Sequence, residues 1–184
     1  MAFSIGDFRS KGLADGGARP NLFQVQIQSA PVTFPSNNAV GGFSFACKVA
    51  AIPASTLAAF DVPYFGRAVK VVGNRTFDNL SMTIINDEKM EIRSAVERWM
   101  GSMNTHVGNK QTLATAGSAT SGANFTIQHY AKSGEGLGDP WQFINAFPVS
   151  LGEIALDWGS NDTIEEYTVE WAYDYWIHGT NTEG

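Results

Sequence analysis

The chain has 184 residues and a net charge of -6, with 16% charged and 12% aromatic residues. That length favours one domain with a substantial core. The charged share is low against about 25% in an average protein, and few charges with many aromatics are typical of surfaces covered by partners. An acidic chain without a basic footprint argues against nucleic-acid binding through phosphates.

Residues 1–20 predict an N-terminal arm. Glycines and a proline interrupt every hydrophobic period there, and basic residues are scattered among them. Such a segment has little to bury on a monomer, so we expect it to become ordered on a neighbouring subunit. The sequence before the first strand has no basic region followed by an apolar core, so we expect no signal peptide.

Two strands are predicted next. Apolar residues alternate with glutamines over 21–29, which predicts a strand with one apolar and one uncharged polar face. A loop rich in Pro, Asn and Gly follows at 30–42. Alternation over 43–49 predicts a second strand in which Cys47, the only cysteine of the chain, faces inward as a buried structural thiol. A single cysteine excludes an internal disulfide and suits a reducing cytoplasm.

Residues 52–66 form an apolar, proline-containing segment that is longer than an ordinary hairpin loop of about 2–5 residues. Its large side chains would be unfavourable in water. We expect this loop to dock on another subunit rather than fold over its own domain. The candidates for that contact are Leu57, Phe60, Val62, Tyr64 and Phe65.

Alternation over 67–77 and 80–85 predicts two further strands, and the one convincing helix of the chain follows. Asn86-Asp87 supplies its N-cap, because a side-chain oxygen there can accept from the free amides of the first turn. The helix is expected over 88–103, where apolar residues recur at helical spacing along one stripe.

The last third of the chain predicts a loop and then strands. Residues 104–123 are rich in Asn, Thr, Gly, Ser and Ala and predict a flexible loop. Strands are expected over 124–132, 141–147 and 154–158. The clearest alternation runs over 166–177 and predicts one unusually long strand, whose edge must be paired or covered.

These elements together predict a mainly β fold in a single domain over 1–184. The natural arrangement is an antiparallel β-sandwich or small barrel with one flanking amphipathic α-helix. No catalytic, cofactor-binding or metal site is predicted. The three histidines are far apart without further ligands at metal-site spacing, and the Gly-x-Gly-x-Gly segment at 134–138 precedes a strand rather than a helix. Glu165 and Glu166 are adjacent in an extended segment and point to opposite faces.

Four stretches occur in an order that is specific in combination. The first reads Ala-Arg-Pro-Asn-Leu-Phe at 18–23, and the second reads Cys-Lys-Val-Ala-Ala-Ile-Pro-Ala-Ser-Thr-Leu at 47–57. The third reads Val-Pro-Tyr-Phe-Gly-Arg-Ala-Val-Lys at 62–70 and runs into Gly-Asn-Arg-Thr-Phe at 73–77. The fourth reads Ile-Ile-Asn-Asp at 84–87 and is followed by Ile-Arg-Ser-Ala-Val-Glu-Arg-Trp-Met at 92–100. In these stretches the chain resembles the tail tube protein family of contractile-tailed bacteriophages. The C-terminal third matches less sharply.

The resemblance implies a structural subunit and no enzyme. Six subunits would form a ring, and stacked rings would form a hollow tube inside the contractile sheath, the conduit for genome ejection. The implied partners are further copies of the chain, the tail sheath protein, baseplate and tail terminator proteins, and double-stranded DNA that passes without specific binding. The implied location is the virion, after assembly in the host bacterial cytoplasm.

A lumen for DNA should be negative or neutral, because such a wall does not adsorb phosphates. The polar faces of the predicted strands are the candidates for that wall: Gln24, Gln26, Gln28, Glu166, Glu170 and Asp174.

Two other interpretations stay open from the sequence. The same fold could form the inner tube of a contractile bacteriocin or of a toxin-injecting particle, which would carry no DNA. A different class of protein, a monomeric β-barrel, could bind a small apolar ligand with the aromatic stripe of 166–177.

Overall fold

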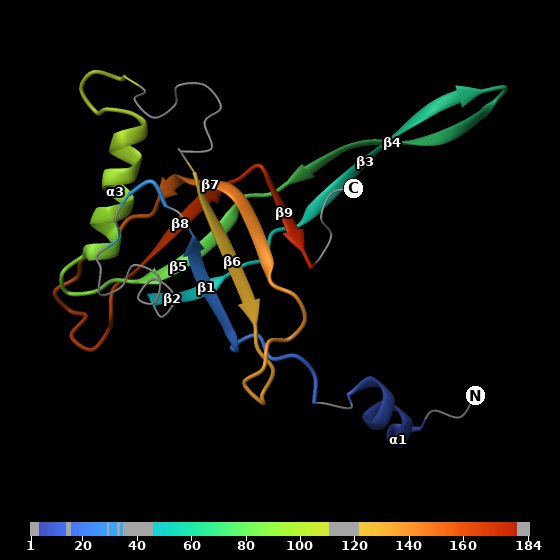
Figure 1. The fold of residues 1–184 in the computed structure, drawn as a ribbon, viewed down its shortest axis with the longest axis horizontal. Coiled ribbons are helices and arrows are strands. Elements are labelled where there is room, and N and C mark those ends of the chain that lie inside the picture. Colours follow the sequence, from blue (N-terminus) through green and yellow to red (C-terminus); the bar gives the residue numbers. More distant parts are fainter. Residues whose placement is uncertain are drawn as a thin grey trace.

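A computed structural model describes residues 4–13, 16–28, 30–32, 34, 46–110 and 122–179 (Figure 1). The predicted mainly β, antiparallel fold with a flanking helix is confirmed. The elements are α1 (Ile5–Asp7), η1 (Phe8–Gly12), β1 (Phe23–Gln28), β2 (Cys47–Ala50), β3 (Ser55–Tyr64), β4 (Arg67–Phe77), β5 (Leu80–Ile85), α3 (Glu91–Met103), β6 (Ala123–His129), β7 (Trp141–Leu151), β8 (Glu166–Ala172) and β9 (Tyr175–His178). Parts of the loops predicted at 30–42 and 104–123, and the first half of the strand predicted at 43–49, lie outside the described residues.

Two antiparallel sheets form the body of the protein and share strand β7. The first sheet has the order β1-β6-β7-β9, and the second has the order β7-β8-β5-β2. The sheets cross face to face, with β1 and β6 lying over β2 and β5 in Figure 1. Strands β1 and β2 also contact each other on the side away from β7. The body is therefore a sandwich that is nearly closed into a barrel.

The core between the sheets follows from strict alternation in the paired strands. In the second sheet, Leu80 of β5 lies opposite Trp171 of β8, and Met82 lies opposite Val169. All four side chains are fully buried. Because successive residues of a strand point to opposite faces, the residues between them are polar and outward. The strand predicted at 80–85 is thus confirmed to the residue.

Helix α3 begins later than predicted, at Glu91 rather than at 88. Met90 adopts a left-handed backbone with φ of 51°, which keeps the preceding turn out of the helix. The Asp87 carboxylate still accepts a hydrogen bond from the Glu91 amide, 3.1 Å away, so the predicted capping residue acts on the first helical turn. Ile92, Ala95, Val96 and Trp99 of the apolar stripe are buried, and the Trp99 ring lies 5.5 Å from that of Trp171.

Strand β7 continues through Pro148 to Leu151, beyond the end of the strand predicted over 141–147. The second half of β7 is an edge of the second sheet, and the register shifts between Pro148 and Ser150. An edge strand tolerates a residue without an N–H donor. The predicted strand at 154–158 is wrong: residues 152–165 form an irregular loop.

The long strand predicted over 166–177 is also wrong in one respect, because it breaks into β8 and β9. At the break, the Asp174 amide donates to the Ile144 carbonyl, and the Asp174 carboxylate accepts from the Asn145 side chain at 2.9 Å. Beyond this corner the inward face changes, so that Trp176, rather than Tyr175 or Ile177, packs against the core. The alternation of the sequence could not predict this change of face, because the corner shifts the pattern of inward side chains by one residue.

The loop predicted at 52–66 is wrong. Most of these residues lie in strand β3, which pairs with β4 in a separate hairpin. The turn consists of Phe65 and Gly66, with φ of 42° and 78°. Positive φ at both central residues matches the twist of a tight two-residue hairpin. The hairpin extends away from the sandwich, at the upper right of Figure 1.

Candidate assembly surfaces

The hairpin β3–β4 has one apolar and one polar face. Phe60 lies opposite Val71, and Val62 lies opposite Val69. Directly paired residues point to the same side, so these four side chains form one apolar face. On the other face, Asp61 lies opposite Lys70 and forms an ion pair with it at 3.1 Å.

All five predicted contact residues lie on this hairpin and are exposed. Their exposed fractions are Leu57 51%, Phe60 53%, Val62 42%, Tyr64 66% and Phe65 91%. At the tip, the rings of Tyr64 and Phe65 meet edge to face, 4.6 Å apart. Among the described residues nothing covers this apolar face, and each strand of the hairpin leaves one backbone edge without a partner strand. Both features are typical of a surface that another chain covers.

The base of the hairpin is fixed to the body. Phe77, the last residue of β4, packs its ring against those of Trp176 and Tyr173, at 6.1 and 6.2 Å. The Tyr173 hydroxyl donates to the Asp78 carbonyl at 2.6 Å, and burial raises the pKa of this tyrosine to about 12. The hydroxyl therefore stays protonated as a donor. The hairpin is held at a set place on the body while its far end stays uncovered.

The predicted lumen residues do not share one wall. Gln24, Gln26 and Gln28 lie on β1, at the end of the first sheet, whereas Glu166 and Glu170 lie on β8 in the second sheet. The outward faces of two packed sheets point in opposite directions. Asp174, the sixth candidate, lies in the corner between β8 and β9 and bonds Asn145. The structure thus separates an uncharged wall from an acidic one.

The uncharged wall consists of amides and hydroxyls in cross-strand pairs. Gln24 of β1 lies opposite Gln128 of β6, and Gln26 lies opposite Thr126. The Tyr130 hydroxyl donates to the Gln24 side chain at 2.7 Å. This face offers hydrogen bonds but no charge.

The acidic wall lies on β8 and β5. Glu166, Thr168 and Glu170 of β8 are exposed, and Thr168 and Glu170 lie opposite Thr83 and Ser81 of β5. The Lys48 ammonium on β2 pairs with Glu166. Among the described residues Glu170 forms no ion pair with a basic side chain, so this wall is negative around Glu170.

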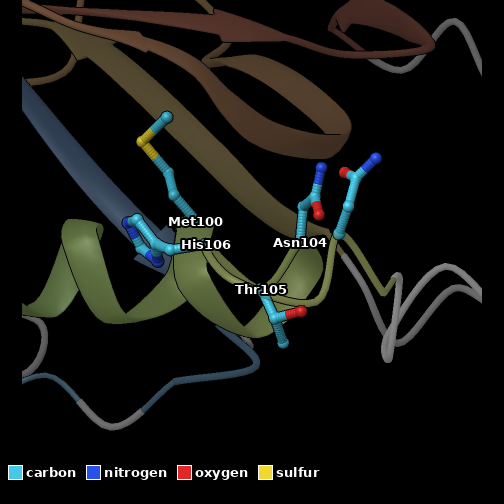
Figure 2. Close-up of a pocket in the computed structure, with 5 residues that line it drawn as sticks. Met100, Asn104, Thr105 and His106 are labelled. Carbon is cyan, nitrogen blue, oxygen red and sulfur yellow. The ribbon is translucent and has the colours of Figure 1, made fainter.

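A small hollow of about 310 Å³ lies at the C-terminal end of α3. Figure 2 shows that its side chains do not converge, because Met100 and Thr105 point in opposite directions. The other lining residues are Asn104, His106 and Asn109. Within the described ranges, no three His, Cys, Asp or Glu side chains are grouped as metal ligands, and no helix is long and apolar enough to span a bilayer.

The Cys47 thiol is buried in the core, as predicted. Burial raises its pKa to about 12, because the charged thiolate would lose its hydration. The Sγ donates to the Val49 carbonyl at 3.5 Å. This environment keeps the thiol protonated and unreactive near neutral pH.

One surface was missed from the sequence. The loop 152–165 displays Trp158 with its side chain fully exposed, together with Leu156 and Ile164. The exposed surface was not predicted because a strand was expected at 154–158. The signal that could have found it is Asp157-Trp-Gly-Ser, because Asp followed by Gly and Ser is typical of a turn.

Comparisons with known proteins agree on one family. Residues 18–179 match the model of the family described as phage tail tube protein. The tail tube protein gp19 of Enterobacteria phage T4 is 33% identical over 175 residues, which cover 95% of this chain and 94% of the relative. The tail tube protein gp19 of Enterobacteria phage T6 is 32% identical over the same length.

Two solved structures share the fold. A chain in the structure of the anti-feeding prophage baseplate has a TM-score of 0.64 at 14% identity, over 90% of this chain and 98% of that one. A chain in the sheath–tube complex of an extracellular contractile injection system has a TM-score of 0.59 at 17% identity, over 96% and 97%.

Proposed function

Because the chain belongs to the phage tail tube protein family and is a structural subunit of a tail tube, we propose that six copies form a ring and that rings stack into the conduit for genome ejection. The single domain over 1–184 is the building unit. The observation that carries this proposal is the uncovered apolar face of the hairpin β3–β4.

The hairpin supports assembly because its face is as apolar as a protein core, while no other described part of the chain covers it. Phe60, Val62, Val69 and Val71 are each exposed by 39–53%. Covering such apolar area releases about 25 cal/mol per Å². In the proposed ring, this face and Leu57, Tyr64 and Phe65 pack on a neighbouring copy, and the free strand edges pair with strands of that copy.

We assign the lumen to the acidic wall of β8 and β5. A ring of six copies carries about -36 in total (6 × -6) from the chain's net charge of -6. Glu166 lies on this wall in its ion pair with Lys48, and the unpaired Glu170 makes the wall negative. A negative wall repels phosphates, so double-stranded DNA passes without adsorbing. The glutamine wall of β1 then faces outward, and Asp174 lies beside the edge of the lumen.

The remaining partners follow from the assemblies of the structural relatives. One of these structures is a baseplate, and another is a complex of sheath and tube. A third, with a TM-score of 0.62 and 15% identity, is a sheath and tube terminator. For this chain we propose the matching set: a tail sheath protein around the tube, a baseplate at one end and a terminator at the other. Its place is the virion tail, after assembly in the host cytoplasm, and its role is structural rather than enzymatic.

The lumen assignment is tested by adding positive charge to one wall at a time. Thr168→Lys with Thr83→Lys places two lysines opposite each other on the acidic wall. Gln26→Lys with Thr126→Lys is the matched control, because these residues lie opposite each other on the other sheet. We expect both variants to form tubes in electron micrographs. In complemented phage, DNA ejection should slow only with the first variant, since lysines in the lumen bind phosphates. Slow ejection with the control alone would overturn the assignment.

A further inference from the structure

The loop 152–165 presents its apolar side chains in a fixed way. The Asp157 carboxylate accepts from the Gly159 amide at 3.0 Å and from the Ser160 hydroxyl at 3.3 Å. This turn holds Trp158, which lies between the bonded residues, out in solvent at full exposure. Leu156 and Ile164 are exposed by 80% and 70%. A rigidly displayed tryptophan with two aliphatic neighbours is typical of an interface centre.

Both ends of the loop are anchored to the body. The Arg93 guanidinium of α3 donates to the Gly152 carbonyl at 3.1 Å, and the Gly152 amide donates to the Thr168 carbonyl at 2.7 Å. At the other end, the Asn86 side chain donates to the Glu165 carboxylate at 2.8 Å. The loop is therefore a preformed surface, which lowers the entropy lost on binding.

A hollow of about 690 Å³ lies along this loop, lined by Ile154, Leu156, Trp158 and Ile164 together with acidic side chains. A second hollow, beside Met90 and Asp87, shares Ile164 and Glu165 with it. Residues 153–166 contain five acidic side chains and no lysine or arginine. The surface as a whole fits a short apolar segment that carries positive charge.

The N-terminal arm has that chemistry. Three large apolar side chains of the arm are exposed: Ile5 of α1 by 70%, Phe8 of η1 by 57%, and Leu13, which follows η1, by 41%. Residues 1–20 hold three basic and two acidic side chains, a net +1 in a chain of net -6. The hydroxyl of Ser4 caps the first turn by accepting from the Asp7 amide at 3.3 Å, so the arm has local structure without a covered face.

The arm and the loop lie on opposite sides of the body. In Figure 1, α1 extends to the lower right, whereas the loop between β7 and β8 lies to the left, below α3. In this arrangement the arm of a chain lies away from the loop of the same chain. A donor on one side and an acceptor on the other make a heterologous contact, which closes into a ring or continues as a stack.

We propose that the arm of one copy docks on the loop 152–165 of a second copy, with Ile5, Phe8 and Leu13 against Leu156, Trp158 and Ile164. Arg9 and Lys11 face the acidic residues around the hollow. This inference rests on the proposed tube and names the acceptor surface of its arm. Each copy thereby donates one arm and receives another.

Cysteine cross-linking tests the contact while keeping its apolar side chains. Ser10→Cys with Ser160→Cys places one thiol on the arm and one on the loop, and the natural Cys47 is buried. The control combines Ser10→Cys with Ser133→Cys, another exposed serine in the turn after β6. We expect oxidation of assembled tubes to give a ladder of covalent oligomers with the first pair only. Tubes that form normally without that ladder, an equal ladder with the control, or an internal cross-link in the monomer would each overturn the proposal.

Charge exchange gives a second test. Arg9→Glu with Lys11→Glu, or Glu153→Lys with Asp162→Lys, should each raise the concentration needed for assembly about tenfold, as expected for the loss of about two charge pairs. Combining all four changes should restore assembly to within about threefold of the unchanged protein. A combined variant that is weaker than either pair would contradict the contact. If the unchanged protein forms no tubes at all, the proposed function fails instead.

Discussion

Two antiparallel strand pairs of this protein have similar patterns and opposite surroundings. In β5 and β8, Leu80, Met82 and Val169 are completely buried between the sheets. In β3 and β4, Phe60 and Val62 are exposed by 53% and 42% although they also alternate with polar or small residues. Alternation therefore shows that a strand has an apolar face but not whether the same chain covers it. The first pair stabilises the subunit, and the second is available to stabilise the assembly.

The comparison predicts that changes in the two regions have separable effects. A substitution in the core should lower the free energy of unfolding of the subunit. A substitution in the hairpin should leave that free energy nearly unchanged and weaken association.

Trp171→Ala should have the largest effect. The Trp171 ring is fully buried, with the rings of Phe125 and Trp99 at 4.7 and 5.5 Å. Truncating a buried aromatic residue costs about 3–5 kcal/mol, because transfer energy is lost and a cavity remains. Urea unfolding of the dilute subunit measures it. Phe65→Ala, at the exposed tip of the hairpin, is the control and should change the free energy by less than about 0.5 kcal/mol.

Phe60→Asp with Val71→Asp should abolish tubes at concentrations where the unchanged protein assembles. Two charges on the apolar face should raise the dissociation constant at least about a hundredfold, which equals about 2.7 kcal/mol. Light scattering and electron microscopy measure assembly, and a thermal melt measures the subunit. Lys70→Ala on the opposite face is the control. A large fall in the melting temperature of the dilute double variant would show that the hairpin face belongs to the subunit's own core.

Arg93→Ala should have an intermediate effect on the subunit. The guanidinium donates to the Gly152 carbonyl, lies over the Tyr167 ring at 5.1 Å and pairs with Glu97 at 3.0 Å. Losing these contacts should cost about 1–2 kcal/mol. Glu97→Ala, which removes only the exposed pair, should cost less than about 0.5 kcal/mol. Equal losses from both changes would mean that the anchor to Gly152 contributes nothing.

Asp87→Ala should cost about 1 kcal/mol, because the Glu91 amide loses its hydrogen-bond acceptor at the start of α3. The matched control is Glu88→Ala, a nearby acidic residue in the same turn. Chemical denaturation of both variants checks the difference. A control that is as destabilised as Asp87→Ala would assign the effect to local charge rather than to the cap.

The smallest effect is a pH dependence at Cys47. The folded thiol has its pKa raised from 9.0 to about 12. Between these values the unfolded chain loses the proton and the folded chain keeps it, so stability is full below pH 9 and falls as pH rises. The loss should stay below about 1 kcal/mol at pH 9.5. Cys47→Val should remove this part of the decline while behaving like the unchanged protein at pH 7. An unchanged slope would contradict the burial of the thiol.

The sequence predicts the sandwich well because its strands are short and their apolar faces are covered within the chain. Cys47, Val96 and Trp99 are buried as expected. It predicts the ends of elements poorly where one residue overrides the pattern. Met90 delays the helix with a left-handed backbone, and the corner at Asp174 changes the inward face of the last strand.

The candidate surfaces are predicted in part. The five hairpin residues are exposed as a set. Residues 52–66 were expected to be a loop because Pro63 and a run of small residues obscure the strand pairing with β4. The six lumen candidates were grouped by polarity. Polarity could not assign Gln24 and Glu170 to different sheets, because that division depends on pairing between distant segments.

Amide hydrogen exchange in the dilute subunit and in assembled tubes tests most directly whether the hairpin is a surface for other copies. We predict that amides of β5 and β8 exchange slowly in both states. Amides at the free edges of β3 and β4 should exchange quickly in the subunit and at least about a hundredfold more slowly in the tube, since pairing with another chain protects them. Equal exchange of the hairpin amides in both states would show that no other copy covers the hairpin.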